Sequence, residues 1–169
     1  MNLQEIIQNA LDGNAILFLG AGFSVGAKNV LHKDFLIGSG LCKELIREGC
    51  IDVKDEEPRD LEDLGYVSQR YLSSGNTKRD LINVIKNNYS CLSVAESHKI
   101  IASIKWKKIY TTNYDDVMET ASREVSILRE PVVATTQIGD VYNLKNAVIH
   151  INGYVGDVNE KNMYSTFKL

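Results

Sequence analysis

The feature that most constrains the fold is a short apolar run that leads directly into a glycine turn. Residues 15–19 read Ala-Ile-Leu-Phe-Leu, and residues 20–24 read Gly-Ala-Gly-Phe-Ser. A continuous apolar run of this length is typical of a strand that is buried on both faces of a parallel sheet. The glycines let backbone N–H groups approach a pyrophosphate, and the Ser24 hydroxyl can bind a ribose or a phosphate. The alternative is a tight strand-to-helix turn that binds no ligand.

This turn differs from the ordinary dinucleotide fingerprint. A GxGxxG motif that began at Gly20 would need a third glycine at position 25, but the next glycine is Gly26. The acidic residue that usually follows the motif is also missing at its normal spacing. A standard dehydrogenase is therefore disfavoured.

Further elements follow from apolar periodicity and from capping residues. Two capping boxes are predicted, Thr77 with Asp80 and Ser93 with Glu96, each at the start of a helix. Helices are expected over 3–11, from Leu41 to near Gly49, from Leu61 to near Gly75, after Thr77, after Ser93, and through Met118 and Ala121. Strands are expected over 15–19, 108–112, 125–128, 132–134 and 147–151.

The alternation of strands and helices predicts an α/β fold. We expect a Rossmann-like, mostly parallel sheet with helices on both faces and no zinc-ribbon module. In such sheets, ligands bind outside the carboxyl ends of the strands. With 169 residues the chain suits one domain, and we expect 1–169 to be an NAD-binding domain at the N-terminal end of a longer protein.

Composition excludes several classes of function. The formal charge of −3 provides no basic face for nucleic acid. The longest apolar run is far too short to cross a membrane, and the N-terminus does not resemble a signal peptide, so a cytoplasmic location is predicted. Cys42, Cys50 and Cys91 form no CxxC pair, which favours reduced, mostly buried thiols over a disulfide framework or a zinc site.

Two more polar motifs follow predicted strands. Residues 111–115 read Thr-Thr-Asn-Tyr-Asp, and Asn113 and Asp115 could face one ligand. Their alternative role is an Asx turn that caps the following helix. Residues 150–153 read His-Ile-Asn-Gly, and a period of two would place His150 and Asn152 on the same face, within reach of one pocket.

The other histidines and the acidic stretch are expected to be structural or solvent-exposed. His32 and His98 stand alone, and no spacing of His, Cys, Asp or Glu resembles a metal site. The seven acidic residues between Asp52 and Asp63 are typical of a solvated loop and helix face.

Taken in order, the three motifs resemble the sirtuin-like family, also called silent information regulator two, over about residues 15–157. The resemblance implies that the first motif binds NAD⁺ phosphates and ribose, that Asn113 and Asp115 line the nicotinamide pocket, and that position 152 is catalytic. The implied cofactor-binding residues are Gly20, Ala21, Gly22, Phe23, Ser24, Asn113, Asp115 and His150, and the implied catalytic residues are Asn113, Asp115 and Asn152.

This chain departs from the family at position 152, where the catalytic histidine is replaced by asparagine. An amide cannot accept a proton as an imidazole does, so we hypothesise that Asn152 is an inactivating substitution, natural or engineered. Residues 25–41 also lack the GIPDFR-like stretch of protein deacylases, and no four-cysteine ribbon is present. The resemblance is therefore closer to bacterial antiphage-defence NADases.

The resemblance implies an NAD⁺ glycohydrolase that releases ADP-ribose and nicotinamide and halts phage growth by depleting NAD⁺. It implies NAD⁺ as substrate, no metal, a homo-oligomer, and activation by a phage protein or a partner defence subunit, without nucleic-acid or membrane contacts. A sensor that binds NAD⁺ or an ADP-ribose derivative without turnover is the alternative, and a deacylase ranks last.

Overall fold

The computed structural model describes residues 2–36, 39–134 and 146–163 and has the predicted α/β fold. Its helices are α1 (Leu3–Leu11), α2 (Gly40–Glu48), α3 (Leu64–Ser73), α4 (Lys78–Tyr89), α5 (Glu96–Ser103) and α6 (Val117–Glu124). Its strands are β1 (Ile16–Leu19), β2 (Lys28–Asn29), β3 (Cys91–Ser93), β4 (Lys108–Thr111), β5 (Glu130–Val133) and β6 (Ala147–His150). The described residues also form three short 3₁₀ helices: η1 (Ala21–Ser24), η2 (Asp60–Glu62) and η3 (Val155–Asp157).

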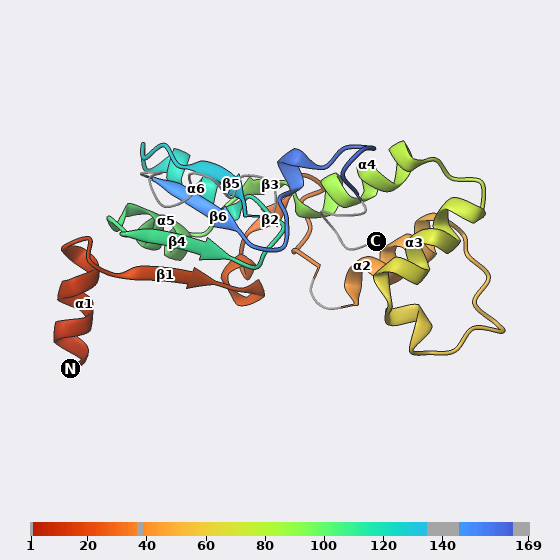
Figure 1. Ribbon diagram of the computed structural model, residues 1–169, viewed down its shortest axis with the longest axis horizontal. Helices are drawn as coiled ribbons and strands as arrows, with labels where there is room; N and C mark the ends of the chain where they lie inside the picture. The colour runs from red at the N-terminus through yellow and green to blue at the C-terminus, as the bar shows by residue number, and fades with distance from the viewer. Residues whose placement is uncertain (1, 37–38, 135–145, 164–169) are drawn as a thin grey trace.

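The main sheet is parallel and has the order β1-β4-β6-β5 (Figure 1). Helices α5 and α6 pack against one face, where Ala102 and Ala121 meet Leu19, Ile109 and Val148. The second face holds a smaller cluster that comes from strands and from the turn after β5 rather than from a helix: Val132, Ala147 and Ile149, with Tyr110 and Ala134 beside them. The sequence-based prediction of a Rossmann-like parallel sheet is confirmed.

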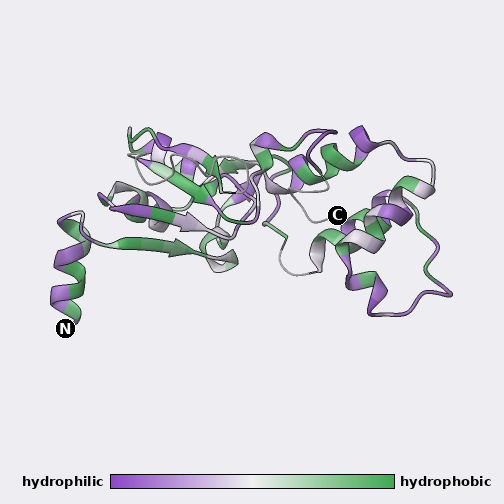
Figure 2. Cartoon of the chain, viewed as in Figure 1, coloured by the Kyte–Doolittle hydropathy of each residue, from purple (hydrophilic) through white to green (hydrophobic). Residues whose placement is uncertain are grey.

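Strand β1 lies at the edge of this sheet, which corrects the expectation that it is buried on both faces. Ile16 is 58% exposed and Phe18 is 63% exposed, whereas Leu19 is buried. The strand that is buried throughout is β6, which lies between two neighbours. Leu17 and Leu19 pack on the face that α5 and α6 cover, whereas Ile16 and Phe18 alternate to the other face and stay exposed. An apolar run does not reveal whether both faces are covered, because the covering elements are set by the tertiary structure. Figure 2 shows β1 as apolar along its length.

Helix α1 ends as predicted, and Gly13 after it adopts a φ of 77°. The left-handed conformation at this position favours glycine. None of the helix residues is buried, and α1 lies at the far end of the molecule from α2 and α3 (Figure 1).

Helices α2, α3 and α4 form a second region, beyond the carboxyl edge of the sheet (Figure 1). Its core includes Leu45, Val67, Leu81 and Ile85, all with 1% exposure or less. Val158 and Met163, which follow β6 and η3, pack into the same cluster. The chain therefore crosses from the sheet to the helices a second time after β6.

Only one of the two predicted capping boxes forms. Thr77 accepts a hydrogen bond from the Asp80 N–H at the start of α4, and Asp80 accepts one from the Thr77 N–H. The Ser93–Glu96 prediction is wrong, because Ser93 lies in β3 and α5 is capped at Ala95. The Ala95 N–H donates instead to Nδ1 of His98 at 2.9 Å.

The strand predicted over 125–128 does not form. These residues follow the C-terminus of α6, where Ser126 has a φ of 59° and the Ile127 N–H donates to the Ser122 carbonyl. A residue in the left-handed conformation interrupts extended backbone. The β-branched residues of this segment therefore do not suffice to form a strand. Neither β2 nor β3, which pair antiparallel, was predicted from the sequence.

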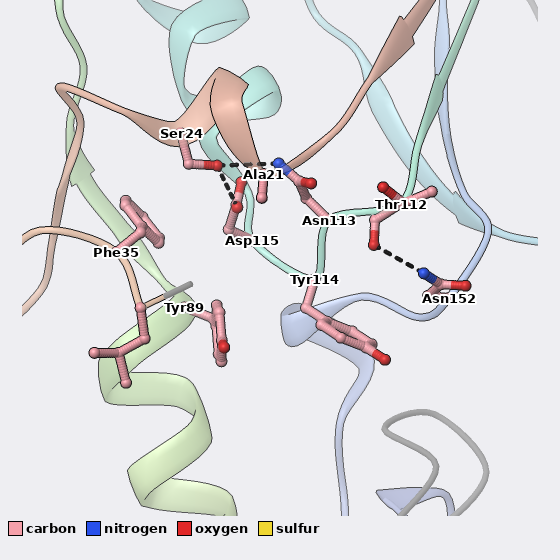
Figure 3. Close-up of a pocket in the computed structure, with 10 residues that line it drawn as sticks. Ala21, Ser24, Phe35, Tyr89, Thr112, Asn113, Tyr114, Asp115 and Asn152 are labelled. Atoms are coloured by element: carbon pink, nitrogen blue, oxygen red, sulfur yellow. Dashed lines mark hydrogen bonds between the residues drawn. The ribbon is translucent and has the colours of Figure 1, made fainter. Parts of the chain in front are cut away.

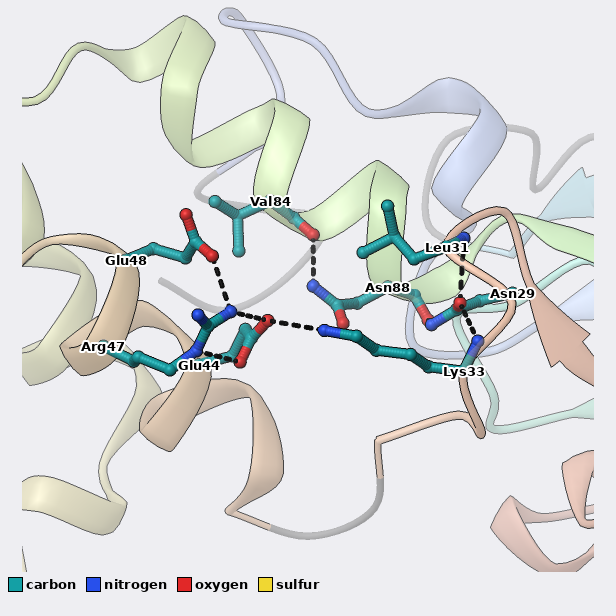
Figure 4. Close-up of polar contacts among 8 residues, drawn as sticks. All are labelled: Asn29, Leu31, Lys33, Glu44, Arg47, Glu48, Val84 and Asn88. Carbon is teal, nitrogen blue, oxygen red and sulfur yellow. Dashed lines mark hydrogen bonds and ion pairs between the residues drawn. The ribbon is translucent and has the colours of Figure 1, made fainter.

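A polar network holds the segment after β2 against the helices (Figure 4). The buried Asn29 side chain accepts from the N–H groups of Leu31 and Lys33 and donates to the Asn88 carbonyl of α4. The Lys33 ammonium lies 3.9 Å from Glu44 of α2. This network fixes the start of the segment that leads to Phe35 and Leu36.

The three cysteines are free thiols: Cys42 is buried, Cys91 is half-buried, and Cys50 is exposed, contrary to the expectation of mostly buried thiols for that residue. Over 2–36, 39–134 and 146–163, no three His, Cys, Asp or Glu residues are grouped so that they could hold a metal ion. In the same ranges, no helix has the length and apolar character needed to cross a membrane.

Candidate functional site

The carboxyl ends of β1, β4 and β6 are joined by backbone hydrogen bonds just beyond the strands. The Thr112 N–H donates to the Leu19 carbonyl at 3.1 Å, and the Ile151 N–H donates to the Thr111 carbonyl at 2.9 Å. The three polar motifs therefore leave the sheet side by side. This is the edge at which parallel sheets bind ligands.

A cavity of about 220 Å³ opens at this edge, between the sheet and the helical region (Figure 3). Its lining residues are Ala21, Ser24, Phe35, Leu36, Tyr89, Thr112, Asn113, Tyr114, Asp115 and Asn152. A second cavity of about 200 Å³ shares Ala21, Ser24 and Phe35 with the first. Together the two reach the size of cavities that hold small-molecule ligands.

Ser24, Asn113 and Asp115 form a continuous hydrogen-bonded chain in the first cavity (Figure 3). The Ser24 hydroxyl donates to Oδ2 of Asp115 at 2.6 Å, a short distance typical of a bond to a carboxylate. The Asn113 amide donates to Ser24 Oγ and to the Gly20 carbonyl, each at 3.0 Å. Both amide hydrogens are thus engaged within the protein, and the amide oxygen is the part that a ligand can use.

Asp115 is the carboxylate among the lining residues, and it is 7% exposed. Burial raises its pKa to about 6, although hydrogen bonds from Ser24 and from the Val117 N–H oppose the shift. The nearby charges of Glu119 and Asp116 raise the pKa further. Its Oδ1 accepts from the Val117 N–H at 3.2 Å, so the predicted Asx turn also forms. One carboxylate therefore caps α6 with one oxygen and contacts Ser24 with the other.

Asn152 also lines the cavity. Its amide nitrogen donates to the Thr112 carbonyl at 3.1 Å, which holds the side chain at the rim opposite Ser24 (Figure 3). A residue at position 152 can therefore face a ligand. The structure thus brings Ala21, Ser24, Asn113, Asp115 and Asn152 together from the residues singled out in the sequence.

His150 does not share this position, contrary to the expectation that it lies on the same face as Asn152. Strand β6 ends at His150, so the alternation of a strand does not extend to 152. His150 is fully buried, with Nε2 at 2.8 Å from Glu119 Oε1 and Nδ1 at 3.0 Å from the Asn113 carbonyl. Burial favours the neutral ring, but the hydrogen bond to Glu119 and its charge outweigh burial and raise the pKa of His150. This ring supports the floor of the site without lining it.

Phe23 and the two glycines of the first motif shape the turn but are absent from the cavity lining. The Phe23 ring lies edge-on to His98 at 5.0 Å, and the Phe23 carbonyl lies 2.6 Å from Nε2 of His98. The prediction that His98 is structural is thereby confirmed. At Gly22 an added Cβ would meet nothing within 4 Å, so neither φ nor packing requires glycine there. Open space above the backbone leaves room for a ligand.

Five lining residues were not identified as site residues from the sequence: Phe35, Leu36, Tyr89, Thr112 and Tyr114. Thr112 and Tyr114 belong to the second motif, so their proximity could have been anticipated. Phe35, Leu36 and Tyr89 come from outside all three motifs and carry no local signal. Burial, with the neighbouring Asp115, raises the pKa of Tyr89, so its hydroxyl stays neutral.

Comparison with known proteins gives a consistent relationship. No family model matches the chain. The NAD(+) hydrolase ThsA of Bacillus cereus (strain MSX-D12) is 25% identical over 150 residues, which cover 88% of this chain and 29% of that protein. The NAD(+) hydrolase ThsA of Enterococcus faecium is 29% identical over 151 residues, which cover 86% and 29% of the two chains. This chain is a distant relative of NAD(+) hydrolases.

A third relative is the NAD(+) hydrolase ThsA of Cytobacillus dafuensis. It is 28% identical over 124 residues, which cover 73% of this chain and 23% of that protein. The resemblance to NAD⁺-cleaving proteins that the three motifs indicated is confirmed as distant homology. The chain spans less than a third of the length of these relatives.

Proposed function

We propose that this chain is an NAD⁺ glycohydrolase domain that converts NAD⁺ and water to ADP-ribose and nicotinamide. One observation carries the proposal: a serine, an amide and a carboxylate from segments about ninety residues apart meet in one cavity, in a relative of NAD(+) hydrolases. The turn over 20–24 would bind the phosphates and the ribose through backbone N–H groups. Asn113 and Asn152 would orient the ribose or the water.

The chemistry fits the charges around the cavity. Cleavage of the bond between ribose and nicotinamide proceeds through an oxocarbenium-like transition state, in which positive charge develops on the sugar. Asp115 lies at the cavity wall, and the half-buried Asp116 follows it. Fixed negative charge in a site of low polarity stabilises such a transition state more than water does.

The biological setting is part of the proposal. The chain would be the NAD-binding part, over 1–169, of a longer defence protein that depletes cytoplasmic NAD⁺ during phage infection. NAD⁺ is its substrate, no metal takes part, and a homo-oligomer or a partner subunit would hold the protein inactive until a phage signal arrives. The greater length of the relatives supports the presence of further segments.

The first test is nicotinamide release from NAD⁺ by the chain and by its Asn152→His form. Restoring a proton-accepting side chain at a position that faces the cavity should raise the rate about 10²- to 10⁴-fold. Asn152→Gln is the matched control, because it is a longer amide without a basic nitrogen and should not raise the rate. If neither form releases nicotinamide or binds NAD⁺ in calorimetry, the proposal is wrong.

A non-enzymatic sensor of NAD⁺ or of an ADP-ribose derivative is the second candidate. Asn152 favours it, because an amide at the rim can bind a ligand but cannot act as a base. This function predicts calorimetric binding of NAD⁺ without turnover, both in the chain and in Asn152→His.

A further inference from the structure

No histidine of the chain lines the cavity in which NAD⁺ would be cleaved. His32 is exposed, His98 is buried between the Ala95 N–H and the Phe23 carbonyl, and His150 is buried against Glu119. The replacement of histidine at position 152 is therefore not compensated by another imidazole. A proton acceptor for the attacking water has to come from a different chemical class.

The titratable side chains that line the cavity are Tyr89, Tyr114 and Asp115. Burial raises the pKa of both tyrosines, which keeps them protonated and unable to accept a proton near neutral pH. Among the described residues that line the first cavity, Asp115 is left as a proton acceptor, and its Oδ2 accepts a hydrogen bond from the Ser24 hydroxyl. Asp34 lines the second cavity, but its carboxylate is exposed and paired with Lys28. Ser24 is 4% exposed, and it also lines the second cavity, so its hydroxyl lies where the two spaces meet.

We propose that Ser24 and Asp115 form a relay that accepts the proton of the attacking water in place of the missing histidine. The inference rests on the proposed hydrolysis of NAD⁺ and deepens it. The Ser24 hydroxyl donates to Asp115 at 2.6 Å, and the Asn113 amide donates to the same Ser24 oxygen at 3.0 Å. The serine oxygen keeps one lone pair for a further donor, and a water molecule can fill that role.

The reaction balances without another reactant. The bond between C1 of the ribose and the nicotinamide nitrogen breaks, and its electron pair leaves with neutral nicotinamide. The water oxygen forms the new bond to that carbon, and one water proton passes to Ser24 Oγ. The Ser24 proton passes at the same time to Oδ2 of Asp115, which becomes a neutral carboxyl group and later releases the proton to solvent.

The relay works only while Asp115 is ionised. Burial raises the pKa of Asp115 to about 6, so the carboxylate predominates above that pH and is lost below it. The groups that act on Asp115 come from several elements. The charges of Glu119, which lies on α6, and of Asp116, which precedes α6, raise the pKa of Asp115. Hydrogen bonds from the Ser24 hydroxyl and from the Val117 N–H lower it. Asp115 in turn acts on Tyr89 of α4, on Cys91 of β3 and on His150 of β6.

The competing role for Asp115 is to hold the nicotinamide amide or merely to cap α6. Either role predicts a change in KM or in stability. A third role, stabilisation of the positive charge that develops on the sugar, would also make turnover depend on the ionisation of Asp115, but it does not need the Ser24 hydroxyl to carry a proton. Removing the Ser24 hydroxyl separates the possibilities. It abolishes a hydrogen bond that lowers the pKa of Asp115, so any turnover that remains should require a higher pH.

The test is the pH dependence of kcat/KM for nicotinamide release between pH 4.5 and 9, with NAD⁺ binding measured in parallel by calorimetry. For the unaltered chain, kcat/KM should fall about tenfold per pH unit below about pH 6. In Asp115→Asn this acid limb should disappear, and the rate should drop about 10²- to 10⁴-fold while NAD⁺ still binds. In Ser24→Ala the rate should drop by a similar factor because the relay is cut, and the midpoint of the remaining limb should move to higher pH. A role of Asp115 through its charge alone predicts the shifted midpoint without this drop in rate.

Asp116→Asn is the matched control, since Asp116 is a neighbouring, half-buried carboxylate outside the cavity lining, whose Oδ1 accepts from the Cys91 N–H. Its pH profile should keep the acid limb, with the midpoint moved to lower pH because the charge of Asp116 raises the pKa of Asp115. Nicotinamide release by Asp115→Asn with an unchanged profile would overturn the relay and leave the proposed hydrolase intact. Absence of both release and NAD⁺ binding in the unaltered chain would overturn the hydrolase itself.

Discussion

At the scale of single residues, Gly22 and Gly75 both have open space around them, but only Gly75 has a backbone conformation that favours glycine. Gly22 has no positive φ, and an added Cβ would meet nothing within 4 Å. Gly75 has equally open space but a φ of 93°, and it lies after α3, outside the three polar motifs. The fold therefore does not require glycine at position 22, and we expect its role to be the close approach of the proposed ligand.

Gly22→Ala should fold with nearly unchanged stability and bind NAD⁺ more weakly, because its methyl group would occupy space that a phosphate needs. Gly75→Ala, the matched control, should lower the free energy of unfolding by about 1 kcal/mol through its strained φ and leave NAD⁺ binding unchanged. Thermal unfolding and calorimetry on both variants check this. Equal NAD⁺ affinities in Gly22→Ala and the unaltered chain would exclude close approach at this turn.

At the scale of elements, the start of a helix could be predicted where the capping residues contact only their own helix. The prediction failed where a strand includes one of the capping residues. Thr77 and Asp80 satisfy each other's backbone N–H groups within one turn of α4. Ser93 has the same spacing to Glu96, but β3 takes Ser93 into a pair with Lys28. A residue that pairs with a distant strand cannot also cap the following helix.

The two sites therefore make a matched pair of substitutions. Thr77→Ala should lower the free energy of unfolding by about 0.5–2 kcal/mol, because the Asp80 N–H loses its partner. Ser93→Ala should change it by less than about 0.5 kcal/mol, since the exposed Ser93 side chain caps no helix. Urea denaturation of both variants checks the difference. A comparable loss in Ser93→Ala would mean that α5 begins where the sequence pattern placed it.

At the scale of the whole molecule, the buried His150–Glu119 pair connects the sheet, α6 and the floor of the site. His150 lies on β6, Glu119 lies on α6, and the second ring nitrogen of His150 lies 3.0 Å from the Asn113 carbonyl. Tyr154 lies on the segment that leads from β6 toward the helical region. Its ring contacts the imidazole of His150, with 4.6 Å between the two ring centroids. Because both side chains are 1% exposed or less, removal of Glu119 would leave Nε2 of His150 buried without this partner.

Glu119→Leu should lower the free energy of unfolding by about 3–5 kcal/mol, as expected when one partner of a buried charge pair is removed. Glu119→Gln should cost less, about 1 kcal/mol, because its amide can donate to a neutral His150. The raised pKa of His150 means that the charged pair stabilises the fold below the unfolded-state pKa of histidine. This contribution is lost as the pH rises through the folded-state pKa.

The gap in stability between Glu119→Leu and the unaltered chain should therefore narrow from pH 6 to pH 9. Thermal and urea unfolding at both pH values measure it. Equal losses for the leucine and glutamine variants at pH 6 would show that the negative charge of Glu119, and not a hydrogen bond that an amide can replace, governs stability at this position.

The sequence by itself determined where most helices form and that the three polar motifs lie at one edge of the sheet. Apolar periodicity, the Gly13 stop and the Thr77 cap define helices through contacts within a few residues. The three polar motifs could be placed together because the carboxyl ends of parallel strands share one edge. That reasoning brought Ser24, Asn113, Asp115 and Asn152 to one site.

Only the tertiary structure decided which strand lies at an edge, which residues close the cavity and where His150 points. An apolar strand looks the same in sequence whether one of its faces is covered or both are, so the exposure of Phe18 could not be predicted. Phe35 and Tyr89 reach the cavity because helices pack beyond the sheet, which no local pattern encodes. The Ser24–Asp115 bond joins residues 91 positions apart and exists only when the chain is folded. The chemistry proposed for this protein depends on such distant contacts, although their residue types are visible in the sequence.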